Sequence, residues 1–396
     1  MKNDELKYYS EHNMSPEHQD ISDIEVHYAR RGKLYRQCGI PEIAFRDAEI
    51  LEVGPGSGYN TLAFFHWNCR HVDLVEANPA GIKDVQNLFK EQVIPNDRYS
   101  IYECFIEDYE NENKKYDIVI AEGFIQHIEN QKEVLDKLTS LLNDKGIIVI
   151  TCEDKISWFI ELMKRLVGWA ITQNIREYEE KVQYLTKIFE PQLKQLRGVS
   201  KPPADWVRDI ILNPEINNEH DLNLISAIEY LGDGFEVLGS SPQMFTDYSW
   251  SKDIWCDYKK EYENQFAEKR LSLLMANMCE VILPVEQVQI LARYFETIVK
   301  AEVAYEKTLN ADRINDILTA MDAMEGIVAN NMPNKFIKVF NEIKDVLLCI
   351  QTGKEVKMEE YPDFFTAFGR TQQYISFEKN NYSTVIIKPE NSERRS

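Results

Sequence analysis

The spacing of apolar and polar positions changes along the chain and divides it into two parts. In the first 150 residues, short apolar runs at 50–53, 71–76, 99–105, 116–121 and 147–151 alternate with stretches of helical spacing such as 131–142. Short runs rich in β-prone residues and bounded by turn residues predict strands. Strands that alternate with helices in this way predict five β-α units of an α/β fold with a parallel sheet.

Beyond residue 255 the pattern is helical throughout. Apolar residues recur every three or four positions in 288–298 and in 336–350, with breaks near Pro284, Asn310 and Pro333. This spacing predicts three or four packed helices over 256–352. The apolar stripes are most simply core, and the alternative is a homo-oligomer formed through these C-terminal helices. The polar end of the chain, 381–396, predicts a disordered tail.

A glycine-rich turn follows the first predicted strand. The stretch Glu52-Val53-Gly54-Pro55-Gly56-Ser57-Gly58 ends a strand and precedes a helical run, as in a nucleotide-binding unit. A dinucleotide fold places its third glycine three positions after the second, and Tyr59 occupies that place here. No Gly-Lys-Ser or Gly-Lys-Thr follows, which excludes a P-loop.

The E-x-G-x-G-x-G spacing resembles the first motif of the class I S-adenosylmethionine-dependent methyltransferases. The resemblance implies that the cofactor S-adenosylmethionine lies against this loop, with Glu52, Gly54, Pro55, Gly56, Ser57 and Gly58 as cofactor-binding residues. Glu76 ends the second predicted strand, 22 residues after Gly54, with Ala77 next to it. A carboxylate at this place can accept both ribose hydroxyls of an adenosine, in either a dinucleotide or S-adenosylmethionine.

Two further segments resemble the same family. Ile106, Glu107 and Asp108 occupy the stretch that flanks the adenine in the family, and Phe105 stands where an Asp is usual, so either acid could read the adenine. The segment around Gln126 and His127 resembles the "LEH" turn of small-molecule methyltransferases, with Gln126 in place of the more usual Glu.

Candidate catalytic residues follow the fourth predicted strand. The sulfonium already activates the methyl group, so positioning carries most of the rate. An oxygen acceptor needs a base, for which His127 is the best-placed candidate, whereas a neutral amine needs only orientation. Glu122 ends the strand itself, where the fold places reacting groups. The alternatives are a packing role for His127 and a solvated loop position for Glu122.

The resemblance also implies a fold and its boundaries. We expect a Rossmann-like, doubly wound, seven-stranded sheet that closes with an antiparallel hairpin of strands at 235–240 and 244–250. The expected parts are an N-terminal helical segment at 1–47, a methyltransferase domain at 48–255 with a helical insertion at about 155–220, and a C-terminal helical domain at 256–380.

The insertion should cover the methyl group, because ligands in such folds bind outside the carboxyl ends of the strands. Within it, Asp205, Trp206 and Arg208 are the expected contacts of the acceptor. The alternative is that Trp206 belongs to the core.

The amino-acid composition limits the kinds of molecule that the protein is expected to bind. A formal net charge of −21 over 396 residues disfavours nucleic acid, since phosphate backbones are held by clusters of Lys and Arg. No apolar run reaches the length of a membrane helix and no signal peptide is evident, so we expect no membrane partner and a cytoplasmic location. The seven cysteines lack C-x-x-C spacing, and neither they nor an acid cluster predicts a metal site.

These features together predict an enzyme, an S-adenosylmethionine-dependent methyltransferase that acts on an oxygen or nitrogen of a small molecule or glycan precursor. Two alternatives stay open. One is an NAD-dependent oxidoreductase, disfavoured by Tyr59 in the third-glycine place, and the other is a non-catalytic protein that binds S-adenosylmethionine as a scaffold.

Overall fold

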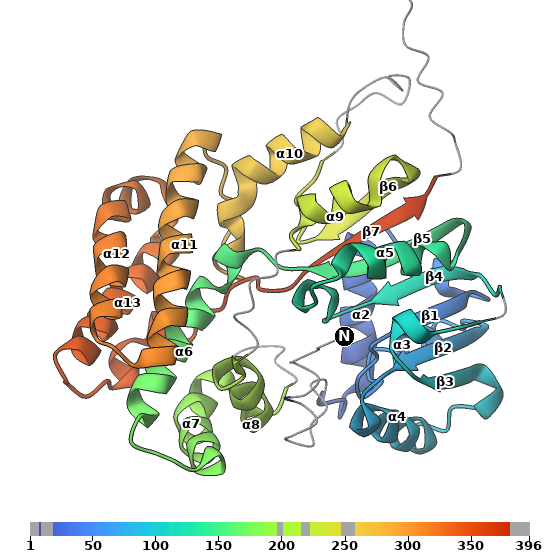
Figure 1. The fold of residues 1–396 in the computed structure, drawn as a ribbon, viewed down its shortest axis with the longest axis horizontal. Coiled ribbons are helices and arrows are strands. Elements are labelled where there is room, and N and C mark those ends of the chain that lie inside the picture. Colours follow the sequence, from blue (N-terminus) through green and yellow to red (C-terminus); the bar gives the residue numbers. More distant parts are fainter. Residues whose placement is uncertain are drawn as a thin grey trace, which may run out of the picture.

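The chain folds into a mixed sheet flanked by helices and a helical unit beside it (Figure 1). This description rests on a computed structural model and covers residues 8, 19–111, 113–195, 201–214, 222–246 and 258–380. The tail expected at 381–396 lies outside these residues. Among the described helices, none combines the length and the apolarity that a membrane crossing requires.

The sheet has seven strands in the order β3-β2-β1-β4-β5-β7-β6. Strands β1 to β5 run parallel, and β7 runs antiparallel to both of its neighbours. The expected fold class, a Rossmann-like sheet closed by an antiparallel pair, is confirmed. The strands are β1 (Glu49–Val53), β2 (His71–Glu76), β3 (Tyr99–Glu103), β4 (Tyr116–Ala121), β5 (Leu142–Cys152), β6 (Phe235–Ser241) and β7 (Gln373–Lys379).

Helices cover both faces of this sheet. Successive side chains of a strand point to opposite faces, so Ile50 packs into one core and Leu51 into the other. Helices α2 (Ile24–Gln37), α3 (Leu62–His66) and α4 (Pro79–Glu91) cover the face of Ile50, and α5 (Gln131–Ser140) and α9 (Leu224–Leu231) cover the face of Leu51. Burial on both faces explains why the central strands are continuous apolar runs.

The closing strand comes from a part of the chain where none was expected. Residues 244–246, the described part of the strand expected at 244–250, form coil, and residues 247–250 lie outside the described residues. The strand that lies between β5 and β6 is instead β7, which pairs Ile375 with Ile150 and with Ser240. The boundary placed at 255 therefore does not end the sheet, because the chain returns to it after all the C-terminal helices.

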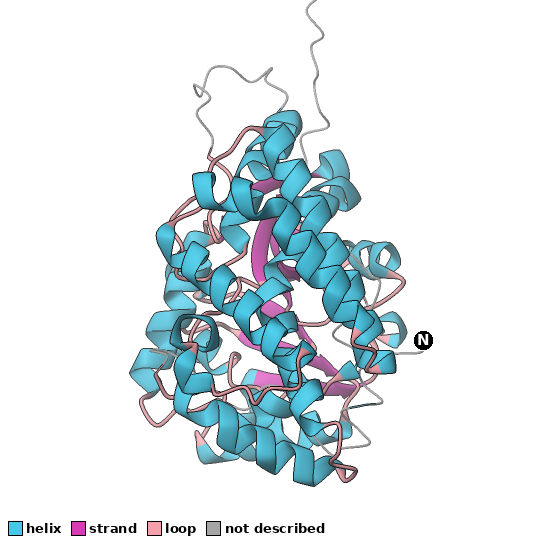
Figure 2. Cartoon of the chain, turned by 90° about the vertical axis from the view of Figure 1, so that its left-hand side faces the viewer, coloured by secondary structure: helices cyan, strands magenta, loops and turns pink. Residues whose placement is uncertain are grey.

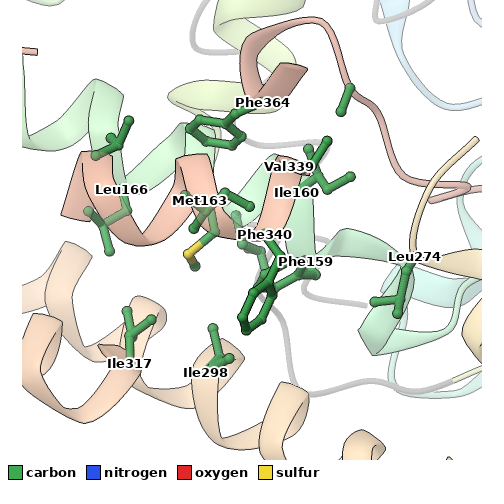
Figure 3. Packing of buried hydrophobic residues seen from close by; sticks show 14 of the residues in the cluster. Phe159, Ile160, Met163, Leu166, Leu274, Ile298, Ile317, Val339, Phe340 and Phe364 are labelled. Atoms are coloured by element: carbon green, nitrogen blue, oxygen red, sulfur yellow. The ribbon is translucent and has the colours of Figure 1, made fainter. Parts of the chain in front are cut away.

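The inserted and the C-terminal helices, expected as separate parts, form one helical unit with a common core. Figure 2 views the molecule from the side of these helices, with the strands of the sheet behind them. Helix α6 lies at the centre of the helical unit, where Phe159 contacts Phe295 at 4.8 Å between ring centroids. Met163 and Leu166 of α6 face Ile298 and Ile317 (Figure 3). The unit contains α6 (Phe159–Thr172), α7 (Tyr178–Leu193), α8 (Pro203–Trp206), α11 (Val285–Thr308), α12 (Asp312–Asn331), α13 (Asn334–Gln351) and α14 (Pro362–Phe365). Helix α10 (Tyr258–Lys269) precedes α11, and its Phe266 packs into the sheet core on the face of Leu51.

Short helical turns connect these elements. The 3₁₀ turns are η1 (Glu42–Phe45), η2 (Asn96–Arg98), η3 (Ile106–Asp108), η4 (Ile125–His127), η5 (Lys155–Trp158), η8 (Gly232–Gly234), η9 (Arg270–Leu273) and η10 (Met358–Glu360), and η6 (Val207–Ile211) is a π-helix. Turns η3 and η4 follow β3 and β4 directly, and η5 follows β5. The residues of all three turns are therefore brought to one edge of the sheet.

Candidate active site

A cavity of about 310 Å³ opens at the carboxyl ends of the parallel strands. Its floor comes from residues that follow β1, β2, β3, β4 and β5, and its far wall from the helical unit and from the segment that leads into β7. This is the place where open α/β sheets bind their ligands. Of the residues expected from the sequence, it brings together Gly54, Gly56, Glu76, Ala77, Ile106, Glu107, Glu122 and His127.

The glycine loop forms one side of this cavity. Gly54 and Gly56 have φ values of +70° and +56°, in the left-handed region that side chains rarely adopt. A Cβ atom on Gly54 would lie 3.1 Å from the ring of Phe124, which is closer than normal packing allows. The backbone therefore reaches the cavity without side chains, and leaves room for a ligand to lie against it.

Glu76, at the end of β2, holds this loop in place. Its Oε2 accepts a hydrogen bond from the backbone N–H of Gly56 over 2.9 Å, and its Oε1 accepts one from Asn78 N–H over 2.7 Å. Burial raises the pKa of the Glu76 carboxyl, and these backbone donors oppose that rise. The same carboxylate lines the cavity, so it can accept ligand hydroxyls with its remaining lone pairs.

Glu52 has a different environment. Its side chain is buried beneath the loop, and its Oε2 accepts a hydrogen bond from the Thr61 hydroxyl over 2.6 Å. Burial raises the pKa of the Glu52 carboxyl to about 8. Among the described residues, Glu52, Pro55, Ser57, Gly58 and Asp108 do not line the main cavity. Glu52 and Pro55 line a smaller neighbouring one, the side cavity.

Glu107 is the acid of the third turn that reaches the main cavity. Its Oε1 accepts a hydrogen bond from Asn130 Nδ2 over 3.0 Å, and its Oε2 is buried without a partner among the described residues. A buried carboxylate oxygen without a donor is costly. Asp108, the alternative acid, is exposed. An N–H group of a ligand in the cavity would satisfy Glu107.

Glu122 is held in a buried ion pair. Arg31 Nη2 lies 2.6 Å from Glu122 Oε1, and Tyr35 donates its hydroxyl proton to the same oxygen over 2.9 Å. Asn60 donates to Oε2 over 3.4 Å. These donors engage both carboxylate oxygens and hold the Glu122 side chain in place. Arg31 and Tyr35 lie one helical turn apart on α2, so both side chains reach Glu122 from the same face of the helix.

The side cavity, of about 250 Å³, shares Gly54, Glu122 and other residues with the main one. Its wall includes His27 and Arg30 from α2. His27 Nε2 lies 2.9 Å from the carbonyl oxygen of Tyr59, and burial lowers the pKa of His27. The exposed Arg30 is thus the cation of this wall that a negatively charged ligand group could reach.

His127 is placed at the junction of the floor and the far wall. Its Nε2 lies 3.6 Å from Glu153 Oε1 and 3.3 Å from Gln126 Nε2. Glu153 follows β5 directly, and Trp158 on η5 donates its indole N–H to Glu153 Oε2 over 3.0 Å. Sequence reasoning missed Glu153 and Trp158, although Glu153 ends a strand in the way that Glu76 and Glu122 do.

The helical unit contributes Lys201, Asp209 and Ile210 to the far wall. Lys201 and Asp209 form an ion pair, and Arg165 Nη1 donates to the Ile210 carbonyl over 2.6 Å. Trp206 does not line this cavity. It is buried, with its ring 5.4 Å from that of Phe189, as expected from the alternative that it belongs to the core.

The neighbours of Trp206 also lie outside the cavity wall. Arg208 pairs with Asp205 and with Glu179 rather than lining the cavity. The same segment reaches the cavity through Asp209 and Ile210 of the π-helix η6.

No group of three or more His, Cys, Asp or Glu side chains that could hold a metal ion occurs among the described residues. The described cysteines are free thiols, and Cys256 lies outside the described residues.

Most of the sheet lies in a part of the chain that resembles a known protein family. Residues 28–189 match a family model described as a methyltransferase domain. Over these residues the chain is similar to methyltransferase domains, and its strand order agrees with the fold expected from the sequence. The match spans the first five strands of the sheet, the glycine loop, helix α6 and most of helix α7.

Curated relatives cover only part of the chain. A ubiquinone biosynthesis O-methyltransferase of Rickettsia bellii is 26% identical over 140 residues, which are 34% of this chain and 55% of that protein. A ubiquinone biosynthesis O-methyltransferase of Rickettsia felis is 24% identical over 189 residues, which are 44% of this chain and 70% of that protein. The chain thus spans about half the length of the first of these relatives.

Among solved structures, PKMT2 from Rickettsia typhi in complex with AdoHcy is 17% identical and covers 60% of this chain and 49% of that chain, with a TM-score of 0.39.

Proposed function

We propose that the protein transfers a methyl group from S-adenosylmethionine to an oxygen or nitrogen of a small molecule. The observation that carries this proposal is the buried Glu107 Oε2 without a described partner, which borders the same cavity as the side-chain-free loop at Gly56. An adenine amino group is a donor of the kind that this oxygen lacks. S-adenosylmethionine supplies a methyl group on a sulfonium centre, and the residues of the chain bind and orient the two reactants.

The cofactor roles follow from these positions. Glu107 would accept from the adenine, with Ile106 against its ring, and Glu76 would accept from the ribose hydroxyls beside Ala77. Arg30 in the side cavity would pair with the methionine carboxylate, because Arg31 already pairs with Glu122. Glu52, Pro55, Ser57 and Gly58 would support the loop from behind, and Asp108 would have no direct role.

The acceptor would occupy the far wall, between His127, Trp158 and the pair of Lys201 with Asp209. The curated relatives are named for O-methylation in ubiquinone biosynthesis, which favours a small organic acceptor over a glycan precursor. The net charge of −21 argues against a nucleic-acid acceptor. The helical unit would cover the bound acceptor. The apolar residues that recur along its C-terminal helices would form its core rather than a surface for homo-oligomer formation.

Two measurements test this function. Isothermal titration calorimetry of the full chain should show binding of S-adenosylmethionine and no comparable binding of NAD⁺; the reverse result would favour the oxidoreductase alternative. Incubation with methyl-labelled S-adenosylmethionine and a native metabolite extract should then give a labelled product by mass spectrometry. Cofactor binding without any labelled product would favour the scaffold alternative.

A further inference from the structure

A chain of hydrogen bonds holds a carboxylate against His127 inside the cavity. The backbone N–H of Gly123 donates to Thr151 Oγ1 over 2.7 Å, and Thr151 in turn donates to Gln126 Oε1 over 3.0 Å. Gln126 Nε2 reaches Glu153 Oε1 at 3.3 Å. Each step fixes the next, so the position of Glu153 is set by Gly123 after β4, by Thr151 of β5 and by Gln126 of η4.

The second oxygen of Glu153 is held from the other side. Trp158 donates its indole N–H to Glu153 Oε2, and this bond also fixes the indole ring at the cavity wall. The Glu153 side chain is 16% exposed and that of His127 is 8% exposed. A carboxylate so shielded from water interacts strongly with a neighbouring imidazole, and favours its protonated form.

We propose that His127, oriented by Glu153, is the general base that takes the proton from a hydroxyl group of an aromatic acceptor lying against Trp158. This inference rests on the proposed function and names the acceptor class for it. A neutral amine needs no such base, because its nitrogen is nucleophilic without losing a proton, whereas a hydroxyl oxygen gives up its proton as it attacks. A flat ring suits a wall formed by the fixed indole of Trp158 and the ring of Phe124.

The acceptor oxygen forms a bond to the methyl carbon while the bond from that carbon to sulfur breaks, and the electron pair of that bond goes to sulfur. The hydroxyl proton passes to the His127 ring, and Glu153 stabilises the resulting imidazolium. The proton then leaves to solvent. His127 is the catalytic residue, whereas Glu153 and Trp158 are positioning residues for it.

The charges of the cavity also restrict the acceptor. Its charged wall residues are Glu76, Glu107, Glu153, Glu122 paired with Arg31, and Asp209 paired with Lys201. Carboxylates outnumber cations, so a phosphate or carboxylate on the acceptor would be repelled. The acceptor is therefore an uncharged phenol-type molecule. All of these groups also act on His127, so the test must isolate the contribution of Glu153.

The test is a titration of His127 by NMR in the full chain. The His127 signal is assigned from its loss in His127→Gln. In Glu153→Gln, which keeps the size of the side chain and removes its charge, the His127 midpoint should fall by about one pH unit or more. Glu153→Asp keeps the charge, so the pH midpoint of the His127 titration should stay close to its wild-type value. Glu129→Gln, which removes an exposed acid two residues from His127, should leave it unchanged.

The second readout is the atom that receives the label. Tandem mass spectrometry of the product formed with CD₃-labelled S-adenosylmethionine should place the label on an aromatic oxygen. In Glu153→Gln the rise of kcat/KM with pH should shift in the same direction as the His127 midpoint, and Trp158→Phe, which keeps a ring but loses the donor, should shift it less.

Two outcomes would overturn the role of His127 and Glu153 without affecting the proposed function. One is a label on nitrogen or carbon, and the other is a His127 midpoint that is equal in the wild type and Glu153→Gln. Failure of the full chain to bind S-adenosylmethionine would instead overturn the proposed function.

Discussion

Arg31 on α2 and Glu122 at the end of β4 form a buried ion pair, with 2.6 Å between Arg31 Nη2 and Glu122 Oε1. Their side chains are 7% and 10% exposed, and Tyr35 donates to the same carboxylate oxygen. The pair joins the N-terminal helix to the cavity floor. The pair gives Glu122 a structural role in holding α2 against the cavity floor, and our proposal that His127 is the base rests on its contact with Glu153.

Removing one partner of this pair should destabilise the protein strongly. Arg31→Met leaves the Glu122 carboxylate buried beside the cavity without its cation, and we expect a loss of about 3 to 5 kcal/mol in the free energy of unfolding. Urea denaturation followed by circular dichroism measures it. Arg36→Met removes the exposed partner of Glu42 on the same helix, where the side chains are 68% and 46% exposed, and should cost about 1 kcal/mol or less. Equal losses in the two variants would contradict the structural role of the pair.

Glu76 should contribute directly to cofactor affinity. Glu76→Ala removes the acceptor of the ribose hydroxyls and of Gly56 N–H, and should weaken S-adenosylmethionine binding by about 1.5 to 3 kcal/mol, the range for hydrogen bonds to a charged group. Glu76→Gln should recover part of this loss. Glu103 is the register partner of Glu76 on β3 and is exposed, so Glu103→Ala serves as the control. Calorimetry that finds the same affinity in all three variants would place the ribose elsewhere.

Glu52 should make the stability of the protein fall as the pH rises. Its folded pKa is about 8, whereas an unfolded Glu titrates near about 4.3, so between these values the folded state binds more protons than the unfolded state. The free energy of unfolding therefore decreases with pH in this window, by up to about 1.4 kcal/mol per pH unit from this group.

Glu52→Gln removes this titration and can still accept from Thr61. The difference in unfolding free energy between wild type and variant, which cancels the other titrating groups, should therefore grow in favour of the variant from about pH 5 to pH 8. Denaturation series at several pH values measure it. A difference that is constant with pH would show that Glu52 is ionised throughout.

The sheet could be predicted from the sequence because each of its parallel strands is a local pattern. The runs expected at 71–76 and 116–121 are β2 and β4 to the residue, and β1 and β6 differ from their expected ranges by one residue. The expected breaks near Pro284, Asn310 and Pro333 separate α10, α11, α12 and α13. In each case a proline or a turn residue interrupts a regular spacing of apolar residues, and both signals lie within a few neighbouring positions of the sequence.

The closing strand and the arrangement of the helices could not be predicted in this way. Strand β7 begins 132 residues after β6 ends, and its sequence, Gln373 to Lys379, alternates no more clearly than 244–250. Which segment enters the sheet is decided by the helical unit, whose core joins α6 to α11 across more than a hundred residues of chain. Arg31 and Trp206 show the same limit, because their burial depends on partners distant in sequence.

Trp206 should behave as a core residue and not as part of the acceptor site. It is 7% exposed and its ring lies 5.4 Å from Phe189 and 6.2 Å from Phe368. Trp206→Ala should therefore cost about 3 to 5 kcal/mol of unfolding free energy, and Trp206→Phe less. Well below the melting temperature, the affinity for S-adenosylmethionine should stay within about twofold of the wild type in both variants, because Trp206 lies outside the cavity wall.

Asp205→Asn, on the same short helix, provides the matched control. Asp205 is 25% exposed and pairs with Arg208 away from the cavity, so this change should leave stability within about 0.5 kcal/mol and the rate of product formation unchanged. If the labelled product instead formed at least tenfold more slowly in Asp205→Asn with stability intact, the acceptor would have to reach this helix. The far wall would then extend beyond Lys201 and Asp209, because Asp205 influences turnover only if the acceptor or a residue that holds it makes contact there.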